Sequence, residues 1–217
     1  MPQRYADPVE AILLKTALLV PGDDIIEVAQ AALEAAAVVP RPDDVLVICE
    51  TPLAICQGRI VRLDDLRISR GARILNWFMN VDSSIATVYG MQTAIDLAGF
   101  WRIFLSMLVA APLRLAGRRG DFYRLAGRQV AWMDDVTGTM PPYTQDIVLG
   151  PEDPSGVARA ASAALGCGAA VVDANDYGNF EIMGASPGID EDMVGQVMRR
   201  NPQGNDDEQT PLVLVRP

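Results

Sequence analysis

Residues 43–61 read Asp-Asp-Val-Leu-Val-Ile-Cys-Glu-Thr-Pro-Leu-Ala-Ile-Cys-Gln-Gly-Arg-Ile-Val. The run Val45–Cys49 is apolar, rich in β-branched residues and bounded by acidic and proline-containing turns, which is typical of a buried strand. Shortly afterwards comes Gln57-Gly58-Arg59, where glycine permits a tight turn and arginine can hold an anion. The alternative is an ordinary strand, loop and second strand with a surface arginine.

Composition limits the class of protein. Half of the 217 residues are apolar, which is enough to bury a sizeable core. We expect one domain over residues 1–217, or two intimately joined lobes. The net charge of −10 excludes a nucleic-acid partner, because the chain has no basic excess to displace counterions from a phosphate backbone.

Residue types that are missing or rare limit the chemistry further. The chain has no histidine, which excludes histidine-dependent nucleophiles and histidine-ligated metals but leaves carboxylate sites for hard cations. Its three cysteines lack the paired spacing of metal sites and suit a reducing compartment, so we expect a cytoplasmic protein. Charged residues interrupt the apolar segment Leu97–Leu115 before it reaches the ~20 residues of a membrane span. It therefore predicts a buried helix, and we expect no membrane partner.

Apolar periodicity along the chain predicts an α+β (mixed α/β) fold with a buried sheet flanked by helices. The expected helices are residues 25–38, 90–111 (bounded by Gly99 and Pro112), 156–165 and 186–200. The expected core strands are Val45–Cys49, Arg128–Met133, Ala169–Val172 and Thr210–Val215.

Acidic residues follow two of these strands. Asp134 and Asp135 open the segment Asp-Asp-Val-Thr-Gly, and Asp176 comes shortly after Ala169–Val172. Ligands gather at strand ends in α/β folds, and carboxylates suit Mg²⁺ or Mn²⁺, so these three aspartates are the predicted metal ligands. The alternative for residues 134–138 is a turn whose side chains bond their own backbone.

The order of the motifs resembles that of the coenzyme F420-0:L-glutamate ligase (γ-glutamyl ligase) family. Pro21-Gly22-Asp23-Asp24, a helix, the strand Val45–Cys49 and Gln57-Gly58-Arg59 follow one another as in the family, and so do Leu149–Pro154, a helix, a strand and Asn175–Asn179. Several motif residues differ. Thr51 and Ile55 stand where the family has two lysines, Gln57 replaces a glutamate, Asn175 replaces a metal-binding aspartate, and Asn179 replaces an arginine.

The resemblance implies GTP- and metal-dependent formation of a γ-glutamyl amide on a small carboxylate acceptor. It places the nucleotide at Glu50, Thr51, Gln57, Gly58 and Arg59. It also implies a homodimer, which the apolar surface of Phe100–Leu113 would suit. Because several family cations are missing, the alternative is a non-catalytic relative of the same fold that binds a small molecule or a partner.

Overall fold

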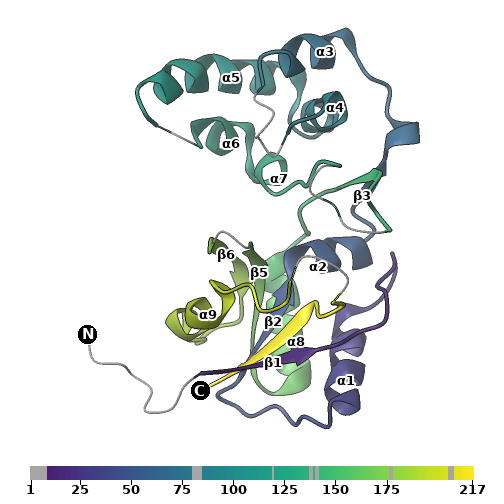
Figure 1. Ribbon diagram of the computed structural model, residues 1–217, viewed down its shortest axis with the longest axis vertical. Helices are drawn as coiled ribbons and strands as arrows, with labels where there is room; N and C mark the ends of the chain where they lie inside the picture. Colours follow the sequence, from purple (N-terminus) through teal and green to yellow (C-terminus); the bar gives the residue numbers. More distant parts are fainter. Residues whose placement is uncertain are drawn as a thin grey trace. The chain divides into compact units, whose positions relative to one another are not determined.

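The structure is a computed structural model that describes residues 9–79, 85–118, 120–136, 139, 142–175, 178–204 and 208–217. The chain divides into two compact units (Figure 1). The first contains the residues up to Gly58 and those from Pro151 onward, and the second contains Arg59–Gly150. The joining of the two units into one domain stays a prediction.

A five-stranded sheet in the order β1-β7-β2-β5-β6 forms the centre of the first unit. Strands β2 and β5 are parallel, and the other pairs are antiparallel. Strand β2 lies in the middle with every residue buried, so the expected strand Val45–Cys49 is confirmed. The strands are β1 Glu10–Leu14, β2 Val45–Cys49, β5 Gly168–Ala174, β6 Phe180–Ala185 and β7 Leu212–Arg216.

Helices cover this sheet (Figure 1). Helix α9 (Glu191–Met198) packs on the side that carries Val47 and Val172. Helix α8 (Pro154–Leu165) packs against β5 and β6, next to α1 (Ile25–Ala35). The short helix α2 (Glu50–Cys56) begins directly after β2. The family-like expectation of a buried sheet between helices is therefore confirmed.

The second unit is mainly helical. A small antiparallel sheet of β3 (Ile60–Arg62) and β4 (Asp146–Val148) adjoins the helices. The core includes Ile85, Met91, Ile103, Met133 and Ile147, all fully or almost fully buried. The helices are the 3-10 helix η1 Leu63–Asp65, α3 Arg70–Asn76, α4 Val88–Ala98, α5 Phe100–Leu115, α6 Asp121–Ala126 and α7 Arg128–Ala131.

Three expectations about the second unit are wrong. The segment Leu97–Leu115 does not form a buried helix, because Ile103 and Ser106 are the only buried residues of α5. Residues 128–133 form the helix α7 and its end, not a core strand, because Val130 and Met133, three residues apart, both point into the helical core. Gly99 does separate α4 from α5, with φ of 84°, but Pro112 does not end α5. The helix continues beyond the proline because Ala116 N–H donates to the Pro112 carbonyl.

In the part of the chain that the structure describes, no single helix is long and apolar enough to cross a membrane. Helices α4 and α5 would meet the length and composition of a span only as a pair, and that pair is bent by 112°.

Candidate functional site

Three sequence motifs meet around one hollow of about 610 Å³ in the first unit. It lies where the starts of α1 and α8 and the end of α2 come together. The motif Pro21–Asp24 contributes the start of α1, Gln57 contributes the end of α2, and the motif Leu149–Pro154 contributes the turn before α8. The polar side chains or backbone around it belong to Asp23, Asp24, Gln57, Glu152 and Asp153.

Backbone and amide hydrogen bonds hold this hollow open between the three helices. Gly22 N–H donates to the Cys56 carbonyl at 2.9 Å, and its φ of 98° favours glycine. The Gln57 amide bonds both backbone groups of Glu152: Nε2 donates to the carbonyl at 2.9 Å, and Oε1 accepts from N–H at 2.7 Å. A carboxylate at position 57 could only accept, so this double contact requires glutamine.

The hollow is electrostatically negative. Asp24 and Asp153 accept from the first turns of α1 and α8, at Ile26 N–H and Gly156 N–H. Burial, together with the negative charges of Asp23 and Asp24, raises the pKa of the Cys56 thiol to about 11. Such a hollow suits the cationic end of a ligand, such as an ammonium group.

Glu50 and Thr51 lie at the carboxyl end of β2, as the sequence predicts, but they begin helix α2 instead of a loop. The Thr51 hydroxyl donates to Glu50 Oε1 at 2.6 Å. Glu50 follows the Cys49–Val172 pair of the parallel strands, and Asp173 follows it on the other strand. Burial raises the pKa of the Cys49 thiol, and the negative charges of Glu50 and Asp173 raise it further.

Asp173 also pairs with Glu181 across β5 and β6. Although residue 173 keeps an exposed surface, partial desolvation of its carboxyl raises its pKa, and the like charge of Glu181 adds to the effect. The carboxyl end of the parallel strands is therefore crowded with negative charge.

This crowding predicts a pH dependence of stability. Since the folded-state pKa of Asp173 is raised, its ionisation costs stability as the pH rises through that pKa, and the cost is absent at lower pH. We expect Asp173→Asn to gain stability relative to the wild type between pH 4 and pH 7 in metal-free buffer. Urea unfolding at both pH values checks this, and an unchanged difference between the two proteins would contradict it.

Gly58 and Arg59 form the turn that the sequence predicts. Gly58 has a φ of 68°, and its N–H donates to the Ile55 carbonyl. Arg59 begins the second unit, where its Nε donates to the Gly150 carbonyl at 3.0 Å and its Nη2 donates to Gln129 Oε1. Both acceptors are neutral oxygens, so these two bonds orient the guanidinium without neutralising its charge.

Asp135 is almost completely buried in the second unit, at 2% exposure. Its carboxylate accepts from Thr87 N–H and from the Thr87 hydroxyl, both at 2.7 Å, and from Val136 N–H at 2.8 Å. Thr87 is the N-cap of α4, so Asp135 completes the start of that helix. Asp134 is half-buried and forms an isolated backbone bridge with Val148.

The model of the F420-0:Gamma-glutamyl ligase family matches residues 13–191. This chain belongs to that family. The match spans both units and includes every motif quoted above, so the resemblance in motif order is confirmed. No curated protein matches the chain.

Two family departures have a structural reason in this member. Gln57, in place of glutamate, supplies the donor and the acceptor that bond the Glu152 backbone. Asn175, at the position where the resemblance implies a metal-binding aspartate, bonds Asn179 through its side chain and its backbone. Its Oδ1 accepts from Asn179 N–H at 3.3 Å, and its own N–H donates to the Asn179 carbonyl.

The predicted metal ligands fit a cation unequally. Asp135 fits poorly, because three hydrogen bonds occupy its buried carboxylate. Asp176 lies outside the described residues. Within residues 9–79, 85–118 and the later described ranges, no three acidic or cysteine residues gather closely enough to hold a metal ion. Asp134 and Asp176 therefore stay the proposed ligands.

Sequence reasoning missed the polar residues that the fold adds to the site. Glu152 and Asp153 are part of the motif Leu149–Pro154, for which no ligand role is predicted, and Asp173 directly follows the predicted strand Ala169–Val172. The sequence does contain a signal for Asp173, because this residue directly follows the apolar strand Ala169–Val172 and lies close to the predicted metal ligand Asp176. For Glu152 no local signal exists, because its partner Gln57 lies 95 positions away.

Proposed function

We propose that this family member forms a γ-glutamyl amide on a small carboxylate acceptor, with GTP and Mg²⁺ or Mn²⁺. The observation that carries the proposal is the negative hollow that three family-like motifs surround. Its carboxylates suit the ammonium group of glutamate, the amine-bearing substrate.

The reaction has two balanced steps. An oxygen of the acceptor carboxylate attacks the γ-phosphorus of GTP, and the bond to the β-phosphate oxygen breaks, so that GDP leaves. The glutamate amine then attacks the acyl carbon, phosphate leaves with the bonding pair, and the amine nitrogen gives up a proton. Catalysis of such phosphoryl transfer consists mainly of positioning and of neutralising charge.

The residues of this chain divide these tasks. Glu50, Thr51, Gln57, Gly58 and Arg59 are the proposed nucleotide site. Within it, Arg59 is oriented by its bonds to neutral acceptors and supplies positive charge for phosphate. A divalent metal would neutralise phosphate oxygens.

The alternative is a relative that binds a small molecule or a partner without catalysis. The replacement of two family lysines by Thr51 and Ile55, and of an arginine by Asn179, favours it, because these changes remove positive charge that phosphoryl transfer needs.

A product assay separates these functions. We expect GDP release that requires both L-glutamate and a carboxylate acceptor, and at least tenfold weaker use of L-glutamate by Glu152→Gln, because the hollow loses negative charge. Asp64→Asn, an exposed acidic residue of the second unit, is the matched control and should leave the KM for glutamate unchanged. If no acceptor elicits GDP release, the non-catalytic function replaces the ligase.

Metal binding predicts a second effect. Ligands that bind only the folded state raise the melting temperature with their concentration. We expect millimolar Mn²⁺ to raise the Tm of the wild type, more so with GTP, and Asp176→Ala to abolish the shift. An unchanged Tm with both ligands would favour the non-catalytic relative.

The homodimer and the cytoplasmic location also stay predictions. The described cysteines, Cys49, Cys56 and Cys167, are all free and buried, which suits a reducing compartment. A particle of 23.4 kDa in light scattering at micromolar concentration would contradict the homodimer.

A further inference from the structure

Helix α5 in the second unit reverses the usual pattern of a surface helix. Of its 16 residues only Ile103 and Ser106 are buried. The solvent-facing half carries apolar side chains at the spacing i, i+1, i+4, i+5, i+8, i+9, and the exposed charged residues of the helix are Arg102 and Arg114. These residues, which we call the apolar face, are Phe100, Trp101, Phe104, Leu105, Leu108 and Val109, with exposures from 36% to 70%.

Helix α3 extends this surface. Gly71 packs so closely on Phe100 that an added Cβ would lie 2.8 Å from the ring. Directly after α3, Trp77 and Phe78 are 83% and 67% exposed. With roughly 150–250 Å² for each aromatic side chain, the three aromatic residues of α5 and the two that follow α3 leave on the order of 600 Å² open. This total is comparable with the ~300–600 Å² of the largest apolar patch on a typical monomer.

The charge around the apolar face is positive. Helices α3 and α5 contain four arginines and no acidic residue. Residues 59–150 contain 11 arginines and 8 acidic residues, a net charge of +3, whereas the whole chain carries −10 and the remainder therefore −13. The second unit thus differs in sign from the rest of an acidic protein.

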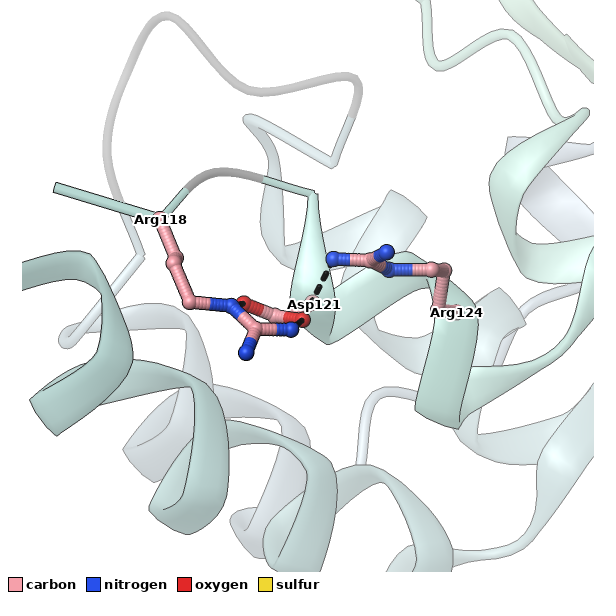
Figure 2. Close-up of polar contacts among 3 residues, drawn as sticks. All are labelled: Arg118, Asp121 and Arg124. Atoms are coloured by element: carbon pink, nitrogen blue, oxygen red, sulfur yellow. Dashed lines mark hydrogen bonds and ion pairs between the residues drawn. The ribbon is translucent and has the colours of Figure 1, made fainter.

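Two arginines follow α5: Arg118 lies before helix α6, and Arg124 lies in α6, which packs against α5 (Figure 2). Arg118 and Arg124 both bond Asp121, at 3.1 Å and 2.5 Å. One carboxylate cannot neutralise two guanidinium groups, and both arginine side chains are more than 60% exposed. Leu115, the last residue of α5, is 91% exposed.

We propose that α3 and α5 bind the surface of an anionic lipid bilayer, with α5 lying in the headgroup region. An exposed aromatic and aliphatic face bordered by arginines is the pattern of helices that lie in the membrane interface. The expectation of no membrane partner rests on the lack of a helix long enough to cross a bilayer. Binding at the bilayer surface does not require such a helix. This inference is independent of the proposed catalytic function.

The charges disfavour a second copy as the occupant of this face. In an antiparallel two-fold pairing of α5 centred on Leu108, Arg102 of one copy lies opposite Arg114 of the other. No acidic residue in α5 neutralises them. A homodimer would then use another surface of the chain.

Vesicle binding tests the proposal. We expect the full-length protein to sediment with phosphatidylcholine–phosphatidylglycerol vesicles at least tenfold more strongly than with phosphatidylcholine alone, and less strongly as salt rises. Brominated lipids of the same composition should quench its tryptophan fluorescence. Leu105→Glu/Leu108→Glu should weaken binding at least tenfold. Val39→Glu, at a still more exposed apolar residue of the first unit, should leave it unchanged.

Three outcomes would overturn the proposal. The first is no sedimentation or quenching of the wild type with anionic vesicles. The second is a dimer that Leu105→Glu/Leu108→Glu splits while vesicle binding is absent, which assigns the face to a second copy. The third is equal loss of vesicle binding in Val39→Glu. Quenching of the wild type by brominated lipids needs no variant, so it decides the question even if the double variant fails to fold.

Discussion

Replacing Asp135 with alanine is expected to lower the free energy of unfolding by about 3–5 kcal/mol, because each buried donor left unpaired costs roughly 1–3 kcal/mol. Thr87 N–H, the Thr87 hydroxyl and Val136 N–H all lose their acceptor. The start of α4 loses part of its cap as well, since the same hydroxyl accepts from Gly90 N–H. Urea unfolding of the metal-free protein measures the effect.

The control is Asp96→Ala. Asp96 accepts from Nε2 of the buried Gln92, so its loss also leaves a donor unpaired and should cost about 1 kcal/mol, well below the cost of losing the three bonds of Asp135. Gly90 gives an independent check, because an added Cβ there would overlap the Asp135 carboxylate. Gly90→Ala should therefore destabilise the protein through the same contact.

The experiment also distinguishes two roles for Asp135. A metal ligand would leave the metal-free protein almost unaffected when replaced, and would lose the Mn²⁺-dependent rise in Tm. Replacing a helix-capping residue would destabilise the metal-free protein and would leave the Mn²⁺-dependent rise in Tm in place. Unchanged stability of Asp135→Ala without metal would restore Asp135 to the predicted metal site.

Local sequence patterns were sufficient to predict the buried central strands of the sheet. The β-branched run Val45–Cys49 and the strand at 169–172 could be predicted because a central strand is apolar at every position. The N-caps of α1 and α9 are also local: the side chains of Asp24 and Asp190 accept from backbone N–H groups two and three positions ahead. Each of these signals lies within a few residues.

The errors arose where distant residues decide the structure. Residues 128–133 have the apolar content of a strand, but the helical core of the second unit accommodates Val130 and Met133 on one side of a short helix. Asp135 has the setting of a metal ligand, but its partner Thr87 lies 48 positions earlier. No local pattern distinguishes a carboxylate that caps a distant helix from one that binds a cation.

The sequence was sufficient to identify the motifs of the site, but not to predict that they lie next to one another in the fold. Asp23 and Gln57 were noted separately, and only the fold brings the ends of three helices around one hollow. Family membership accounts for the order of these motifs along residues 13–191. It does not account for the exposed apolar residues on the outer half of α5.

The last prediction concerns the residue that precedes β2. Asp44 is 1% exposed, and its carboxylate accepts from Arg216 Nε at 3.0 Å, from Arg216 Nη2 at 2.7 Å and from Arg41 N–H at 2.8 Å. Arg216 ends β7, the neighbour of β2, and its Nη2 also donates to the Val39 carbonyl. This pair therefore joins the start of the central strand to the end of the chain.

We expect Asp44→Ala to destabilise the protein by about 3–5 kcal/mol, because removing one partner leaves a mostly buried charge uncompensated. Asp43→Ala, at the exposed neighbouring residue, is the matched control and should change stability by less than about 0.5 kcal/mol. The double variant Asp44→Ala/Arg216→Ala should cost less than the sum of the two single changes, since the second change removes the group that the first left unpaired. Additive costs in urea unfolding would show that the two side chains do not stabilise the sheet as a pair.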